Sequence, residues 1–133
     1  MNAAAAIRRY PTPLPVPFSK AVRAGDFLFL SGVLAMDAQA RIVDGDVQVQ
    51  TRVVLERIAA TLEECGATLQ QVVKATIWLA DLADFTAFNA EYAKHFGGAL
   101  PARSCVQAVL YQGAKVEIEV QAFVPNDMSS DGA

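Results

Sequence analysis

Two stretches of the sequence carry the three- and four-residue spacing of apolar positions that is typical of a helix packed on a core. The first runs from Val47 to Cys65. Asp46 is a suitable N-cap for it, and Gly66 is a suitable residue just past its end. The second is predicted to start at Asp84 and to stop at the following pair of glycines. Its aromatic stripe consists of Phe85, Phe88, Tyr92 and Phe96.

The remaining apolar stretches are short, rich in β-branched or aromatic residues and bounded by turn residues, which predicts strands. These strands are expected at residues 21–23, 27–31, 72–79, 105–110 and 116–124, with a further short one at 41–43. The first two are predicted to form a hairpin around Gly25. The last two are predicted to form another hairpin, which turns near Gln112.

In chain order the elements read β-β-(β)-α-β-α-β-β. Helices that cross over between strands predict an α+β fold, with one mixed β-sheet and both helices packed on one face. The final strand has one apolar face and one mixed face, the latter made of Glu117, Glu119, Gln121 and Phe123. Such a face is unlike a core but suits a subunit interface that contains a polar site. We therefore expect an oligomer.

The composition, with 133 residues of which 53% are hydrophobic and 19% charged, is that of one globular domain. Residues 1–16 are predicted to be an extended, proline-rich lead-in, residues 17–125 the domain, and residues 126–133 a disordered tail. A net charge of −3 argues against a nucleic-acid partner, and no apolar run is long enough for a membrane span. The lack of an export signal and the presence of only two cysteines favour the cytoplasm.

The chain contains little side-chain chemistry. One histidine, His95, and two separated cysteines, Cys65 and Cys105, cannot supply a typical metal site or a catalytic triad, so no metal is expected. What remains is Arg103, and Glu117 on the strand predicted to pair with it. A guanidinium can hold a small carboxylate through two parallel hydrogen bonds, and a glutamate beside it is a candidate base. Each residue alone is more often an ordinary surface charge, so the residues themselves indicate only a candidate anion pocket.

Five motifs follow one another over nearly the whole domain. They are Pro17–Val22, Ser31-Gly32, Asn89-x-x-Tyr92, Pro101–Cys105 and Val116–Glu119. In this order and approximate spacing they resemble the Rid/YjgF (RidA-like) family of enamine/imine deaminases. The resemblance implies a chorismate-mutase-like homotrimer with its sites in the clefts between subunits.

The same resemblance implies an activity, namely hydrolysis of small 2-imino acids of the 2-aminoacrylate type to 2-keto acids and ammonia, without a cofactor. Arg103 is implied to grip the substrate carboxylate, and Glu117 to position and activate a water. Cys105 is implied to contribute mainly through its backbone. The other implied substrate-binding positions are Phe18, Ser31, Gly32, Val33 and Asn89.

Three positions depart from the family pattern: Val16, Phe18 and Val33 stand where Gly, Tyr and Gln are usual. Phe18, with residues 31–37 and 50–52, also resembles the branch associated with pyrimidine breakdown, whose substrate is 3-aminoacrylate. That reaction and a non-catalytic trimer that binds small metabolite carboxylates are therefore the alternatives. The family has also been labelled an endoribonuclease, which an acidic chain without a basic-aromatic surface pattern supports little.

Overall fold

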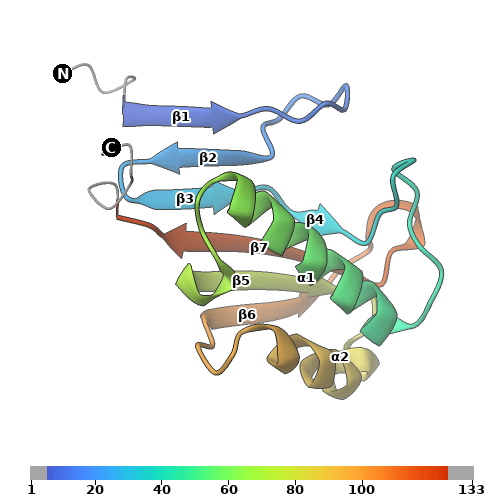
Figure 1. The fold of residues 1–133 in the computed structure, drawn as a ribbon. Helices are drawn as coiled ribbons and strands as arrows, with labels where there is room; N and C mark the ends of the chain where they lie inside the picture. Colours follow the sequence, from blue (N-terminus) through green and yellow to red (C-terminus); the bar gives the residue numbers. More distant parts are fainter. Residues whose placement is uncertain (1–5, 126–133) are drawn as a thin grey trace.

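The computed structural model describes residues 6–125, which form seven strands and two α-helices (Figure 1). The strands are β1 (Ile7–Tyr10), β2 (Ala21–Ala24), β3 (Phe27–Leu30), β4 (Val33–Leu34), β5 (Val72–Leu79), β6 (Ala102–Gln107) and β7 (Val116–Phe123). The helices are α1 (Val47–Glu64) and α2 (Phe85–Tyr92). No helix of these residues is long and apolar enough to cross a membrane.

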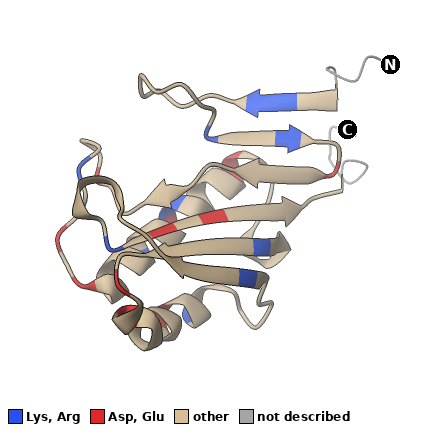
Figure 2. Ribbon diagram, turned by 180° about the vertical axis from the view of Figure 1, so that it is seen from behind, with Lys and Arg blue, Asp and Glu red and all other residues tan. Residues whose placement is uncertain are grey.

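All strands belong to one mixed sheet. Their order is β1-β2-β3-β7-β5-β6, and β4 pairs with β7 outside this path. β5 and β6 run parallel, whereas the other described neighbours are antiparallel. Both helices lie on one face of the sheet (Figure 1), and the opposite face is turned toward the viewer in Figure 2. The predicted α+β fold with two helices on one face is therefore confirmed.

β6 and β7 do not form the hairpin that the sequence predicted. β7 lies between β3 and β5, whereas β6 lies on the far side of β5 and runs parallel to it. The chain path explains this, because α2 connects β5 to β6, and such a crossover places the next strand parallel beside the first. β7 then returns to pair with the other edge of β5. The hairpin prediction was wrong because it took neighbours in the sequence for neighbours in the sheet.

The sheet also begins earlier in the chain than predicted. β1 pairs antiparallel with β2, so part of the expected lead-in 1–16 is an edge strand. The short strand predicted at 41–43 is only an isolated bridge between Ile42 and Met36. β4 was not predicted, because its two residues are too few to show alternation. The predicted tail 126–133 lies outside the described residues.

The residues predicted to begin and end the first helix do so, whereas the second helix is shorter than predicted. The Asp46 side chain accepts a hydrogen bond from the backbone N–H of Val49 at 3.0 Å, and Gly66, just past the end of α1, has a φ of 80°. α2 is shorter than predicted, because it ends at Tyr92 and continues only as a 3-10 turn over Ala93–His95. Three members of its aromatic stripe are nevertheless buried in the core: Phe88, Tyr92 and Phe96.

The two faces of β7 differ as the sequence predicted. The side chains under the helices are fully buried: Val116, Ile118, Val120 and Ala122. Those on the other face remain partly or largely exposed: Glu117, Glu119, Gln121 and Phe123. Phe27 of β3 packs against Phe123 there, with the rings tilted by 58° and their centroids 5.4 Å apart, and Phe29 is 40% exposed. We call this side of the sheet, away from both helices, the open face.

Candidate functional site

Arg103 lies on β6, which forms one edge of the sheet, and its side chain reaches Asn89 of α2. Its Nη2 donates a hydrogen bond to Oδ1 of Asn89 at 2.7 Å. Three aromatic rings of α2 surround the guanidinium, at 5.4 Å from Cζ for Phe85 and Phe88 and at 5.0 Å for Tyr92. These side chains lie together because residues three and four positions apart share one face of a helix.

The charge of Arg103 has no acidic partner among residues 6–125, since none of their ion pairs includes it. Asn89 is a neutral acceptor, and the aromatic rings attract the cation without neutralising it. The guanidinium keeps N–H donors that Asn89 does not use, and a carboxylate can accept two parallel hydrogen bonds from such a group. Arg103 is therefore a half-buried, unpaired cation that is suited to bind a small carboxylate.

Glu117 lies on β7 and belongs to the open face. In the strand register it is flanked by Leu34 of β4 and by Trp78 of β5. Gly32 lies so close that a Cβ at that residue would overlap Oε2 of Glu117. Burial raises the pKa of the Glu117 carboxyl above its usual value, and the negative charge of Glu119 raises it further. A carboxylate with a raised pKa is better matched to general-base work near neutral pH.

Arg103 and Glu117 do not meet within one chain. Arg103 is in register with Ala75 of β5, whose other partner is Val120, and both of these residues are buried under the helices. Glu117 pairs with Trp78 and belongs to the opposite face. β5 also separates their strands, which adds roughly 10 Å between them. The predicted arrangement on two strands of one hairpin is therefore wrong, and the two side chains belong to opposite faces of the sheet.

Three other predicted positions lie together on neighbouring segments. The hydroxyl of Ser31 donates a hydrogen bond to the carbonyl of Ser19 at 2.7 Å, which ties the segment of Phe18 to the one that continues into Gly32. Phe18 is 56% exposed, and Gly32 contacts Glu117. The structure thus places Gly32 against Glu117, with Ser31 beside it in the chain and the segment of Phe18 tied to Ser31, and it places Asn89 against Arg103.

Val33 and Cys105 have side chains that pack against the core. Val33 pairs with Ile118, and Cys105 with Ile77, both fully buried residues. Val33 shares the helix-covered face rather than that of Glu117, and its role in binding a ligand stays a prediction. Burial raises the pKa of the Cys105 thiol, although the nearby charge of Arg103 opposes this. Such a thiol is a poor nucleophile at neutral pH.

Sequence reasoning missed the immediate neighbours of both charged groups. Leu34 and Trp78 flank Glu117 only because of the strand register, which no local pattern indicated. The rings beside Arg103 did have a signal, since their spacing along α2 places them on the same helix face as Asn89. What was lacking was the knowledge that β6 lies next to that helix.

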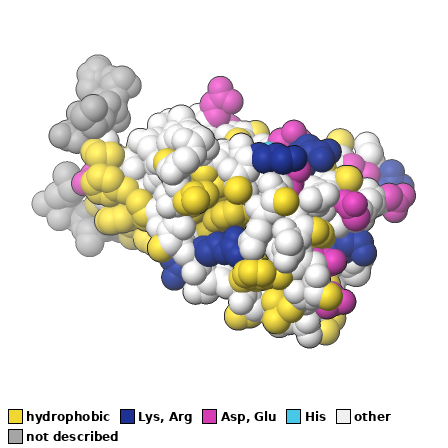
Figure 3. All heavy atoms as spheres, turned by 90° about the horizontal axis from the view of Figure 1, so that it is seen from below, with side chains coloured by type: hydrophobic (Ala, Val, Ile, Leu, Met, Phe, Trp, Pro, Cys, Tyr) yellow, Lys and Arg dark blue, Asp and Glu magenta, His cyan; other side chains and the backbone are white. Residues whose placement is uncertain are grey.

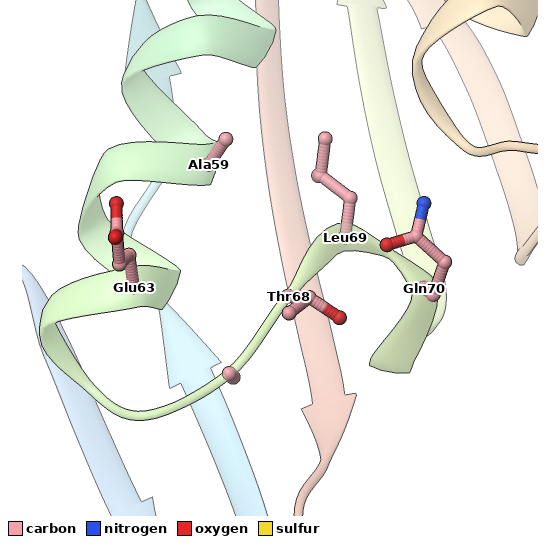
Figure 4. A pocket seen from close by; sticks show the side chains of 6 residues that line it. Ala59, Glu63, Thr68, Leu69 and Gln70 are labelled. Carbon is pink, nitrogen blue, oxygen red and sulfur yellow. The ribbon is translucent and has the colours of Figure 1, made fainter.

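Other parts of the described surface carry less chemistry. Residues 6–125 contain no group of three or more His, Cys, Asp or Glu side chains that could hold a metal ion. A hollow of about 310 Å³ lies where α1 leads into the next turn (Figure 4), and it is lined by Ala59, Glu63, Ala67, Thr68, Leu69 and Gln70. It contains none of the predicted site residues. On the side of α2 and β6, basic side chains lie among hydrophobic ones (Figure 3).

Comparison with known proteins gives consistent matches over most of the chain. Residues 11–124 match the family described as Endoribonuclease L-PSP. The chain is 43% identical over 114 residues to a RutC family protein of Pyrococcus horikoshii, which covers 84% of this chain and 90% of that protein. It is 40% identical over 108 residues to the goat (Capra hircus) 2-iminobutanoate/2-iminopropanoate deaminase, covering 80% and 79%. The crystal structure of RidA from the Antarctic bacterium Psychrobacter sp. superposes with a TM-score of 0.79 at 32% identity, over 90% of this chain and 98% of that one.

Proposed function

Because this chain belongs to the Rid/YjgF family, whose L-PSP model spans residues 11–124, we propose that it hydrolyses small 2-imino acids of the 2-aminoacrylate type to 2-keto acids and ammonia. Imine deaminase activity is a property of named relatives such as the goat protein. The observation that carries the proposal for this chain is the unpaired, half-buried charge of Arg103, held by Asn89 and three aromatic rings. A substrate with a carboxylate next to the reacting carbon would supply the missing negative charge.

In the proposed reaction Arg103 fixes the carboxylate, and Glu117 acts on water. The water oxygen bonds to the carbon of the C=N group while Glu117 accepts a proton from it, which gives a carbinolamine. Glu117 then returns its proton to the nitrogen and accepts the hydroxyl proton as the C–N bond breaks, so that ammonia leaves and the keto group remains. The reaction consumes only water, and the proposal therefore includes neither a metal nor a cofactor.

The proposed site is completed by a second copy of the chain. Arg103 and Glu117 belong to opposite faces of one sheet, so a ligand that contacts both must lie between two subunits. The open face supports this arrangement, because it carries Glu117 together with partly exposed aromatic rings such as Phe27 and Phe123. We propose a homotrimer whose subunits meet through this face, with Arg103 of one subunit opposite Glu117 of the next.

A second candidate substrate is 3-aminoacrylate, which the resemblance to the pyrimidine-breakdown branch suggested. Two residues behind that suggestion have structural roles. Gln50 is buried, where its Nε2 donates to the Val43 carbonyl at 3.0 Å and its Oε1 accepts from the Lys115 N–H at 2.9 Å. Val33 packs against the core. Phe18, another residue of this resemblance, is 56% exposed and so remains available to contact a ligand.

The test is a paired assay of the two substrates. 2-Aminoacrylate and 3-aminoacrylate are each generated in situ, and release of the keto acid or aldehyde acid is followed with and without the protein. We expect acceleration with 2-aminoacrylate at micromolar protein, and its loss in Arg103→Ala with the oligomer unchanged by size-exclusion chromatography. If the protein accelerated only the hydrolysis of 3-aminoacrylate, that compound would replace 2-aminoacrylate as the proposed substrate. If the protein bound pyruvate saturably but accelerated neither reaction, the proposed enzymatic activity would be rejected in favour of a non-catalytic carboxylate-binding function.

A further inference from the structure

The Arg103 guanidinium lies in a socket formed by the aromatic side of α2. We propose that Phe85, Phe88 and Tyr92 are positioning residues, which hold this guanidinium in the orientation that accepts a carboxylate. The proposal rests on the function proposed above, because it assumes that Arg103 binds the carboxylate. It adds residues that need not touch the ligand themselves.

The socket is rigid because most of it belongs to the hydrophobic core. Phe88 is fully buried and Tyr92 is 4% exposed. Their rings lie 5.2 Å apart, and the Tyr92 ring lies 4.8 Å from that of Phe96, which is also fully buried. Neither ring can turn away from Arg103 without disturbing this packed row. Phe85, at 41% exposed, closes the socket on its outer side.

The rings and Asn89 restrain the guanidinium in different ways. An aromatic ring within about 6 Å attracts a cation through its π face, which limits the positions of the Arg103 head group. The hydrogen bond from Nη2 to Asn89 then fixes the rotation of the guanidinium plane. An arginine held in this way loses little additional freedom when it binds a carboxylate, so affinity is higher than for a freely moving side chain.

The Tyr92 hydroxyl indicates that the ring, rather than a hydrogen bond, is the feature in use. This hydroxyl is buried and has no hydrogen-bond partner among the described residues. Burial raises the pKa of the Tyr92 phenol, although the charge of Arg103 opposes this. The phenol therefore stays neutral at physiological pH and does not compete with a carboxylate for the guanidinium.

The experiment measures pyruvate binding by isothermal titration calorimetry in single variants of the full chain. We expect Tyr92→Leu and Phe88→Leu each to raise the Kd for pyruvate by about 5- to 30-fold, the range of one partly desolvated cation–π contact. Tyr92→Phe should restore the affinity lost in Tyr92→Leu. In the deaminase assay the same Leu variants should raise KM more than they lower kcat, because the carboxylate contact is present in both the ground state and the transition state.

Phe96→Leu is the matched control, since Phe96 is equally buried in the same row but has no ring contact with Arg103. An equal rise in Kd for Phe96→Leu and Phe88→Leu would show that affinity follows core packing, and would overturn the proposal. If thermal melting shows that Tyr92→Leu does not fold, Phe85→Leu takes its place, because Phe85 is 41% exposed and lies outside the buried row of rings. An unchanged Kd in that variant would likewise overturn it.

Arg103→Ala separates this proposal from the function on which it rests. Loss of pyruvate binding in Arg103→Ala, with wild-type binding in the ring variants, would leave the carboxylate contact intact and reject only the positioning role. Wild-type binding in Arg103→Ala itself would reject both.

Discussion

At the scale of single residues, each of the two charged groups has the surroundings that its proposed role needs. The Arg103 guanidinium is available to an external anion, because none of the ion pairs among the described residues includes it. Glu117 lies between Leu34 and Trp78, and Gly32 leaves space for its carboxylate. Burial and the charge of Glu119 hold the pKa of Glu117 above its usual value. The first group is thus prepared to bind an anion, and the second to take up a proton.

The raised pKa of Glu117 predicts a pH dependence. Glu117 must be ionised to accept a proton, so kcat/KM should fall as the pH decreases through this pKa. Glu119→Gln removes one of the two causes that raise the pKa, and the acidic limb of the profile should therefore move to lower pH.

Glu117→Gln should bind pyruvate but lose about 100-fold or more in kcat, the scale of general-base catalysis.

These pH profiles are measured on wild-type and variant proteins with the same substrate. Titration of the substrate then affects all profiles equally and does not contribute to the difference between them. Asp44→Asn serves as a control, because it removes a carboxylate that does not act on Glu117. A profile that stays in place in Glu119→Gln would contradict the assigned cause. Unchanged kcat in Glu117→Gln would exclude it as the base.

At the scale of elements, local signals predicted the helices and most strands, but not their pairing. Asp46 and Gly66 mark the two ends of α1, because helix capping depends on residues that are close together in the chain. The neighbours of β7 depend instead on how α2 returns the chain to the sheet, which no local pattern contains. Arg103 and Glu117 were therefore identified from their motifs, while their relation to each other was predicted wrongly. Trp78 and the ring socket were missed for the same reason.

β5 provides a direct probe of the Glu117 side of the sheet. It carries Trp78, the single tryptophan of the chain, in register with Glu117. We expect pyruvate to change the tryptophan emission of the protein in a saturable way, with the same Kd as calorimetry. Trp78→Phe should abolish the signal, although binding itself should remain. No change in emission at pyruvate concentrations that saturate the calorimetric signal would place the ligand away from this face.

At the scale of the whole molecule, the opposite orientations of Arg103 and Glu117 make the proposed site a shared one. A symmetric ring of subunits repeats one contact, so each interface would combine Arg103 of one copy with Glu117 of its neighbour. The open face has both the acids and the exposed rings that such a contact requires. The monomer is, on this proposal, a complete fold with an incomplete site.

Mixing two inactive variants tests this directly. Arg103→Ala and Glu117→Gln are unfolded and refolded together in equal amounts, and deaminase activity is compared with that of each variant refolded alone. In a randomly mixed ring about a quarter of the interfaces should contain both native residues, and activity should recover to about a quarter of wild type. Mixed oligomers that form but stay inactive would indicate that each site lies within one chain.

If Arg103 binds a carboxylate as proposed, its unpaired charge would also couple the folding equilibrium to the concentration of that ligand. On the proposed function, a carboxylate that binds Arg103 in the folded chain, and not in the unfolded one, would stabilise the fold. Ligand present at about 100 times its Kd would add about 2.7 kcal/mol to the free energy of unfolding. The lifetime of the protein would then follow the supply of its acid, since chains without ligand would unfold and be degraded first.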